Sequence, residues 1–224
     1  INIVLHGSGN CPGQPLTWGT VEGSNDGHIQ LYDFLNNNNL SIQSNYDYIT
    51  EVLDIESVVD YYCTEIYFNN KDWPTNNNKL WNFGVEGKWK QVLYDLDGGW
   101  QYLGNGFNAL DRTLSASGSA QNSPYATLLF RKLTESNEFV DDFVERMACL
   151  MKNEFYADTV VNAINEFKSK YQNGMQEHVD RWHYNPSSVS SWLNGVNGLI
   201  SFANSRKSYV INHISTAFGI NFDP

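Results

Sequence analysis

Residues 69–100 read NNKDWPTNNNKLWNFGVEGKWKQVLYDLDGGW, and they decide how the middle of the chain folds. The loop DWPTNN at the start of this stretch contains a proline and several asparagines, which favour turns. Two runs rich in apolar residues follow, Lys79 to Phe83 and Trp89 to Leu93, on either side of a turn bounded by glycines. This pattern predicts a β-hairpin. Its second strand would bring Asp95 back toward Asn77.

The clearest predicted helix precedes this stretch. It begins after Asp54, and aspartate is a favourable N-cap residue. The apolar residues that follow recur at positions 55, 58, 59, 62 and 66, a spacing that keeps one face of a helix buried. The helix ends just before Asn69, so it delivers the chain to the DWPTNN loop.

Most of the remaining chain is also predicted to be helical. Helical spacing of apolar residues predicts further helices near 28–35, 44–52, 128–133, 139–151, 160–171, 189–203 and 210–214. Residues 1–27 are broken by glycines and prolines and predict only one short strand, Ile3 to Leu5. Residues 101–123, rich in Gly, Ser and Asn, predict a long loop. The predicted fold class is therefore α+β, mostly helical, with a small β-hairpin.

Composition limits the partners of the chain. A net charge of -11 argues against nucleic acid or an anionic membrane as partner, since phosphate groups are bound by clustered Lys and Arg. No stretch approaches the roughly 18 to 20 apolar residues of a membrane span. The three cysteines, Cys11, Cys63 and Cys149, are isolated and lack the spacing of a metal site, and their disulfide state stays open.

Asp72, Asn77 and Asp95 are the candidate chemical residues. Asn77 follows Asp72 by five residues and Asp95 follows it by 23. Protein kinases place a catalytic aspartate, a metal-binding asparagine and a second metal-binding aspartate in this order and at similar spacing. On this interpretation Asp72 orients an attacking hydroxyl, while Asn77 and Asp95 hold Mg²⁺ against the phosphates of ATP. Asp and Asn are also common in turns, and this chain is rich in Asn. The spacing alone therefore leaves open the alternative that these residues only form turns.

Two further residues extend this hypothesis. Lys79 lies on the same side of an extended strand as Asn77 and could reach a phosphate, although a solvated strand lysine has the same pattern. Asp97 would add a carboxylate to the metal if the strand continues beyond Asp95. The run DLDG, which begins at Asp95, also resembles the start of a calcium-binding loop. Such loops need glycine at the sixth position and glutamate at the twelfth, but counting from Asp95 these positions are Trp100 and Gly106. The calcium loop is therefore excluded.

Five blocks of the sequence, taken together, resemble successive blocks of the CotH kinase family, the spore-coat protein H group of atypical protein kinases. The blocks are DIESVVDYYCTEIYFNNKDWPTNNNKLW, GKWKQVLYDLDGGW, LFRKLTESNEFVDDFVERM, MQEHVDRW and LISFANSRKSYVINHI. Similarity in the right order runs from about residue 28 to about residue 218, and DWPTNN and LYDLDGGW are its most specific parts.

The resemblance implies a protein-kinase-like C-terminal lobe over residues 28–224, in which the β-hairpin carries the metal ligands. Asp72 then matches the catalytic aspartate of the family, and Asn77 and Asp95 match its metal ligands. The resemblance further implies Mg²⁺ and ATP as cofactors and Ser or Thr of coat or secreted proteins as the substrate. It implies a secreted, extracellular or spore-surface location and a place in a cell-surface or coat assembly.

One departure from the kinase pattern limits these expectations. Kinases hold the nucleotide phosphates with an N-terminal lysine paired with a glutamate, whereas Lys71 is the first Lys or Arg in this chain. We therefore expect residues 1–27 to be an irregular segment joining an N-terminal lobe that is missing here, and the isolated chain to be inactive. The alternative is a non-catalytic scaffold or a carbohydrate or cell-surface adhesion module that keeps the fold, because abundant Trp, Tyr and Asn suit polysaccharide contacts.

Overall fold

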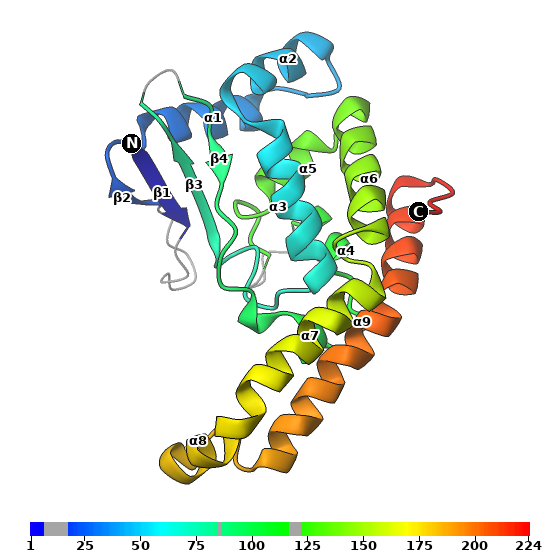
Figure 1. Cartoon of the computed structure of the whole chain (residues 1–224). Helices are drawn as coiled ribbons and strands as arrows, with labels where there is room; N and C mark the ends of the chain where they lie inside the picture. Colours follow the sequence, from blue (N-terminus) through cyan, green and yellow to red (C-terminus); the bar gives the residue numbers. More distant parts are fainter. Residues whose placement is uncertain (7–17, 85–86, 117–121) are drawn as a thin grey trace. The chain divides into compact units, whose positions relative to one another are not determined.

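The computed structural model describes residues 1–6, 18–84, 87–116 and 122–224, so Cys11 and the turn residues 85 and 86 lie outside the described residues. The described chain divides into two compact units. The first comprises residues 1–99 with 108–146, and the second comprises residues 100–107 with 147–224. The α+β prediction is confirmed, because a small antiparallel sheet lies in the first unit and helices form most of the rest (Figure 1).

The sheet has the strand order β2-β1-β3-β4, and every neighbouring pair is antiparallel. Its strands are β1 (Asn2–His6), β2 (Trp18–Glu22), β3 (Asn78–Asn82) and β4 (Lys90–Gln91). The predicted hairpin is thus present as β3 and β4, with Leu80 opposite Gln91, but β4 is shorter than its apolar run suggested. No strand was predicted at β2, because the glycines around it are typical of turns and loops. This short strand forms through its pairing with β1.

The first unit places α3 at its centre. The helices that begin in this unit are α1 (Asp26–Asn37), α2 (Gln43–Val52), α3 (Ile55–Phe68), η1 (Leu96–Gly98), α4 (Ala109–Leu114), α5 (Leu128–Leu133) and α6 (Asn137–Lys152). Figure 1 shows α3 running beside β4. Helix α4 interrupts the segment that was predicted to be one long loop, and it begins at Asn108, whose side chain accepts from the N–H of Asp111 at 3.0 Å.

Local capping and aromatic packing fix α3. The Asp54 side chain accepts from the N–H of Ser57 at 2.9 Å, as predicted for an N-cap, and it also pairs with Lys90 of β4 at 2.8 Å. A cap of this kind contributes about 1 kcal/mol to stability. On the buried face of α3, the ring of Tyr62 stacks on Phe130 of α5 at a centroid distance of 4.5 Å. Helix α3 is therefore held at its start by β4 and along its length by the helical core.

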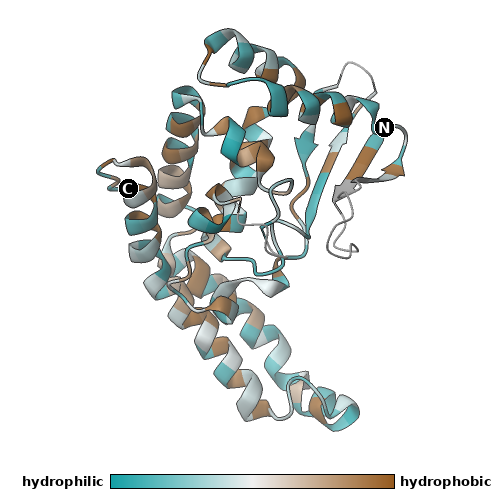
Figure 2. Ribbon diagram, turned by 180° about the vertical axis from the view of Figure 1, so that it is seen from behind, coloured by the Kyte–Doolittle hydropathy of each residue, from teal (hydrophilic) through white to brown (hydrophobic). Residues whose placement is uncertain are grey.

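The second unit is an all-helical assembly of η2 (Trp100–Leu103), α7 (Ala157–Tyr171), η3 (Gln172–Gly174), α8 (Met175–Trp182) and α9 (Val189–Phe218). Apolar residues of α7 and α9 form its core, and Figure 2 shows apolar and polar residues alternating along both helices. Helix α9 is continuous where two separate helices were predicted. Arg206 lies in the middle of α9, is fully buried, and donates to the carbonyl oxygens of Asn105 and Phe107 at 2.8 and 2.9 Å. Of the helices that the structure describes, none is long and apolar enough to cross a membrane.

Candidate active site

The loop from Asn69 to Asn77 is fixed by the helix before it. Helix α3 is capped at its C-terminus by Asn69, whose backbone is left-handed with φ 61° and whose N–H donates to the carbonyl of Glu65 at 3.0 Å. Trp73 is fully buried, with its ring edge-on to Tyr62 of α3 at 5.5 Å. Asp72 directly precedes this anchored tryptophan, so the backbone that carries its carboxylate has little freedom.

Asn77 is also held by α3, and it reaches toward Asp95. Its carbonyl accepts from the hydroxyl of Tyr61 at 2.7 Å, and its side-chain Nδ2 donates to the carbonyl of Asp95 at 3.0 Å. Both Asn77 and Asp95 have left-handed backbones, with φ 57° and 59°. Such conformations are uncommon outside glycine, are best tolerated by Asn and Asp, and cluster at functional sites.

Asn70 joins the two candidate segments through one side chain. Its Oδ1 accepts from the N–H of Asp72 at 3.1 Å, and its Nδ2 donates to the carbonyl of Asp95 at 3.1 Å. The neighbouring N–H of Lys71 donates to the carbonyl of Gly98 at 3.0 Å. A methyl group added at Gly98 would lie only 2.9 Å from Oδ2 of Asp72, so this carboxylate lies directly against the turn that follows Asp95.

Negative charge gathers where the loop from Asn69 to Asn77 meets the Asp95–Gly98 turn, a place that we call the junction. The pKa of Asp95 is raised by a hydrogen bond with Asp97, then by desolvation, and then by the negative charges of Asp97 and Asp72. The sequence interpretation of Asp97 required a strand that continues past Asp95, but β4 ends at Gln91, before Asp95. The η1 turn that follows Asp95 brings the two carboxyl groups together instead. A divalent cation would relieve this repulsion, and carboxylate and amide oxygens are the ligands that Mg²⁺ prefers.

The oxygen atoms at this site limit how a metal could be held. Within the described ranges, no three His, Cys, Asp or Glu side chains are placed to hold a metal by themselves. Mg²⁺ usually keeps several waters and takes only one or two carboxylates together with substrate phosphates. The carboxylates of Asp95 and Asp97 and the side-chain amide of Asn77 supply oxygen atoms of the kind that Mg²⁺ accepts.

Lys79 contacts the residue that precedes Asp95. Its Nζ lies 4.7 Å from the ring centroid of Tyr94, the residue before Asp95. Asn77 precedes β3 and has a left-handed backbone, so the alternation of the strand does not extend from Lys79 to Asn77. The phosphate-binding role of Lys79 stays a prediction.

Three residues of the junction were not among the sequence candidates: Glu65, Asn70 and Arg112. Glu65 is fully buried, and desolvation raises its pKa to about 8, opposed by a hydrogen-bond interaction with Asn70 and by the charge of Arg112. Arg112 of α4 donates to the carbonyls that precede Asp72. Asn70 lies within residues 69–100 and could have been considered as a candidate from the sequence. No spacing in the sequence connects Arg112 with this stretch.

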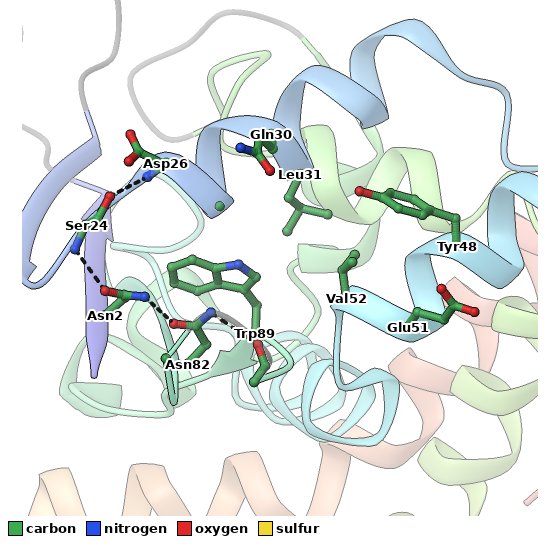
Figure 3. Close-up of a pocket in the computed structure, with 13 residues that line it drawn as sticks. Asn2, Ser24, Asp26, Gln30, Leu31, Tyr48, Glu51, Val52, Asn82 and Trp89 are labelled. Atoms are coloured by element: carbon green, nitrogen blue, oxygen red, sulfur yellow. Dashed lines mark hydrogen bonds between the residues drawn. The ribbon is translucent and has the colours of Figure 1, made fainter.

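A cleft of about 410 Å³ in the first unit lies apart from these residues (Figure 3). Part of its wall is polar and internally hydrogen-bonded, since Asn2 donates to Asn82 at 3.0 Å and Asn82 donates to the carbonyl of Gly87 at 3.1 Å. Figure 3 shows its two carboxylates, Asp26 and Glu51, on opposite sides of the cleft. None of the predicted site residues lines this cleft, and its acids do not converge as a catalytic pair would.

Comparison with known proteins agrees with the resemblance found in the sequence. No curated protein and no solved structure matches the chain. Residues 17–210, most of the chain, match the family model described as CotH kinase protein. The matched range includes both the loop of Asp72 and the turn of Asp95. The chain therefore belongs to the CotH kinase family.

Proposed function

We propose that this chain carries the phosphoryl-transfer site of an ATP- and Mg²⁺-dependent protein Ser/Thr kinase, within a kinase-like C-terminal lobe in which the metal ligands Asn77 and Asp95 flank the β3–β4 hairpin. The observation that carries the proposal is the junction at the carbonyl of Asp95. Amides of both Asn70 and Asn77 donate to this single oxygen, at 3.1 and 3.0 Å. Segments 23 residues apart in sequence, at Asp72 and Asp95, thereby meet at one point.

Each residue has a distinct role in this proposal. Asp72 accepts a hydrogen bond from the attacking Ser or Thr hydroxyl and orients it, because phosphoryl transfer depends mainly on positioning and charge stabilisation. The side chains of Asn77 and Asp95, with Asp97 beside them, bind the metal–phosphate group. Mg²⁺ supplies neutralisation of the charge on the transferring phosphoryl group. The fixed loop keeps the orienting carboxylate and the metal-binding side chains at a constant separation.

Family membership and charge support the choice of substrate. We propose a protein substrate with exposed Ser or Thr, among coat or secreted proteins, with action outside the cell or at a spore surface. The net charge of -11 disfavours nucleic acid as a partner.

A non-catalytic scaffold or adhesion role is the second candidate. It is favoured by the position of Lys79 over the Tyr94 ring. On this view the fold is kept for binding a cell surface or a polysaccharide, and Asp72 does no chemistry.

Phosphate transfer by the complete gene product separates the two candidates. The assay follows ³²P from ATP into a Ser-containing protein in the presence of Mg²⁺, for the wild type, Asp72→Asn and a control, Asp33→Asn. Asp33 is an exposed residue of α1 outside the junction. We expect Asp72→Asn to lose at least about 100-fold in rate with Asp33→Asn unchanged. Equal rates for the wild type and Asp72→Asn, or no transfer by either, would favour the scaffold.

A further inference from the structure

Arg112 reaches from α4 to the backbone directly before Asp72. Its Nη1 donates to the carbonyl of Lys71 at 3.2 Å, and its Nη2 donates to the carbonyl of Asn70. One guanidinium therefore bridges two consecutive carbonyl groups from a helix that is some 40 residues away in sequence. Arginine suits this task because its planar fork presents several N–H groups in fixed directions.

The bridged carbonyls belong to residues that are also hydrogen-bonded to the Asp95–Gly98 turn. The N–H of Lys71 donates to the carbonyl of Gly98, and the Asn70 side chain connects the N–H of Asp72 with the carbonyl of Asp95. The two residues before Asp72 are thus bound to α4 through their carbonyls and to the Asp95–Gly98 turn through their other polar groups. Removing Arg112 would free the carbonyls and allow the chain before Asp72 to rotate.

The charge of Arg112 is maintained by its surroundings. Desolvation lowers the pKa of Arg112 to about 10, while the negative charges of Glu65 and Asp72 oppose that change. The guanidinium is therefore still protonated at neutral pH.

We propose that Arg112 is a positioning residue for the reaction, holding the Asn70–Lys71 backbone so that the Asp72 carboxylate keeps its place against the Asp95–Gly98 turn. This inference rests on the proposed function of Asp72, because Arg112 acts on the substrate only through it. Its role should therefore be visible in the rate of transfer and in the local stability of the loop, with little effect on nucleotide binding.

Two substitutions at Arg112 and one control test the proposal in the complete gene product. Arg112→Gln removes the charge and most of the fork, and Arg112→Lys keeps the charge but lacks the planar fork that fits both carbonyls. The control is Arg131→Gln, because Arg131 of α5 also donates to a backbone carbonyl, that of Pro124 at 2.7 Å, away from the junction. Thermal unfolding confirms that each variant is folded, and if Arg112→Gln is not, Arg112→Lys alone decides.

The first readout is the division between kcat and KM. We expect kcat to fall about 100-fold in Arg112→Gln and about 10-fold in Arg112→Lys, with KM for ATP changed less than about 3-fold, because an orienting group displaced by about 1 Å costs roughly that much in rate. Arg131→Gln should keep the wild-type kcat. A wild-type kcat in Arg112→Lys, or equal losses in Arg112→Lys and Arg131→Gln, would overturn the proposal.

The second readout is independent of activity and is amide hydrogen exchange at Lys71 and Asp72. We expect faster exchange at both amides in Arg112→Lys and unchanged exchange there in Arg131→Gln. Unchanged exchange in Arg112→Lys would overturn the inference even if no phosphate transfer occurs. A third outcome is that amide exchange changes as expected but Asp72→Asn keeps the wild-type rate of phosphate transfer. In that case the proposed function is wrong, and Arg112 holds the loop without serving this reaction, so its assignment as a positioning residue is overturned as well.

Discussion

Replacing Glu65 by Gln should stabilise the protein at pH 8 and remove much of the pH dependence of its unfolding. Glu65 is fully buried, and desolvation raises its pKa from the ordinary 4.5 to about 8. In the unfolded chain the carboxyl is exposed and its pKa returns to the ordinary value. Glutamine has nearly the same shape but carries no charge, so it removes the titration while preserving the packing of α3.

The sign and size follow from proton linkage. Between pH 4.5 and 8 the folded state holds the Glu65 proton while the unfolded state has released it, so the free energy of unfolding falls as pH rises. Below pH 4.5 both states are protonated and the cost vanishes, and above pH 8 it is complete. At 1.36 kcal/mol for each pH unit between the two pKa values, the full cost is roughly 5 kcal/mol, of which about 3.5 kcal/mol develops between pH 5 and pH 8.

The assay is urea unfolding of the chain, followed by tryptophan fluorescence, at pH 5, 6, 7 and 8. The wild-type free energy of unfolding should decline by about 1 kcal/mol per pH unit more than that of Glu65→Gln. The matched control is Glu56→Gln, since Glu56 lies exposed in the first turn of the same helix. If Glu65→Gln and Glu56→Gln both follow the wild-type pH dependence, the Glu65 carboxyl is not a buried proton-binding group and the reasoning fails.

Three further substitutions test the junction and its supports. Gly98→Ala places a methyl group 2.9 Å from the Asp72 carboxylate, which must move about 0.5 Å to reach ordinary contact at 3.4 Å. The rate of phosphate transfer should therefore fall about 10-fold, while the free energy of unfolding in urea should fall by less than about 1 kcal/mol. An unchanged rate would contradict this. Tyr61→Phe leaves the buried carbonyl of Asn77 without its donor and should lower the free energy of unfolding by about 1 to 3 kcal/mol, whereas a loss within error would show that this bond does not fix the loop. Asp54→Ala removes the α3 cap and should cost about 1 to 2 kcal/mol in the same measurement, and an unchanged midpoint would refute its role.

The elements whose formation depends on residues close together in the sequence could be predicted from the sequence. The Asp54 cap and the apolar spacing after it predicted α3, and the two apolar runs predicted the β3–β4 hairpin. Helix α4 was missed although Asn108 provides a cap signal, because six residues carry too little periodicity within a Gly, Ser and Asn-rich segment. Helix α9 was divided in two because the sequence gives no sign that Arg206, in its polar middle, is buried against the carbonyls of two distant residues.

The candidate site divides in the same way. Spacing and the quoted blocks identified Asp72, Asn77 and Asp95, and the backbone contacts bring their segments together. The interpretation of Asp97 required a continuing strand, yet a turn brings its carboxyl to Asp95 by another route. The role of Arg112 could not be predicted, because its bonds go to backbone carbonyls, which leave no trace in residue type.

The Mg²⁺ dependence of phosphate transfer by the complete gene product tests the central claim most directly, because it examines the metal-binding residues and the reaction together. The measurement compares the wild type with Asp95→Asn and with Asp33→Asn, the exposed control on α1. We predict that Asp95→Asn raises the half-saturating Mg²⁺ concentration by about 10-fold or more, while Asp33→Asn leaves it unchanged. The same Mg²⁺ dependence for Asp95→Asn and the wild type would contradict the assignment of the Asp72, Asn77 and Asp95 junction as the phosphoryl-transfer site.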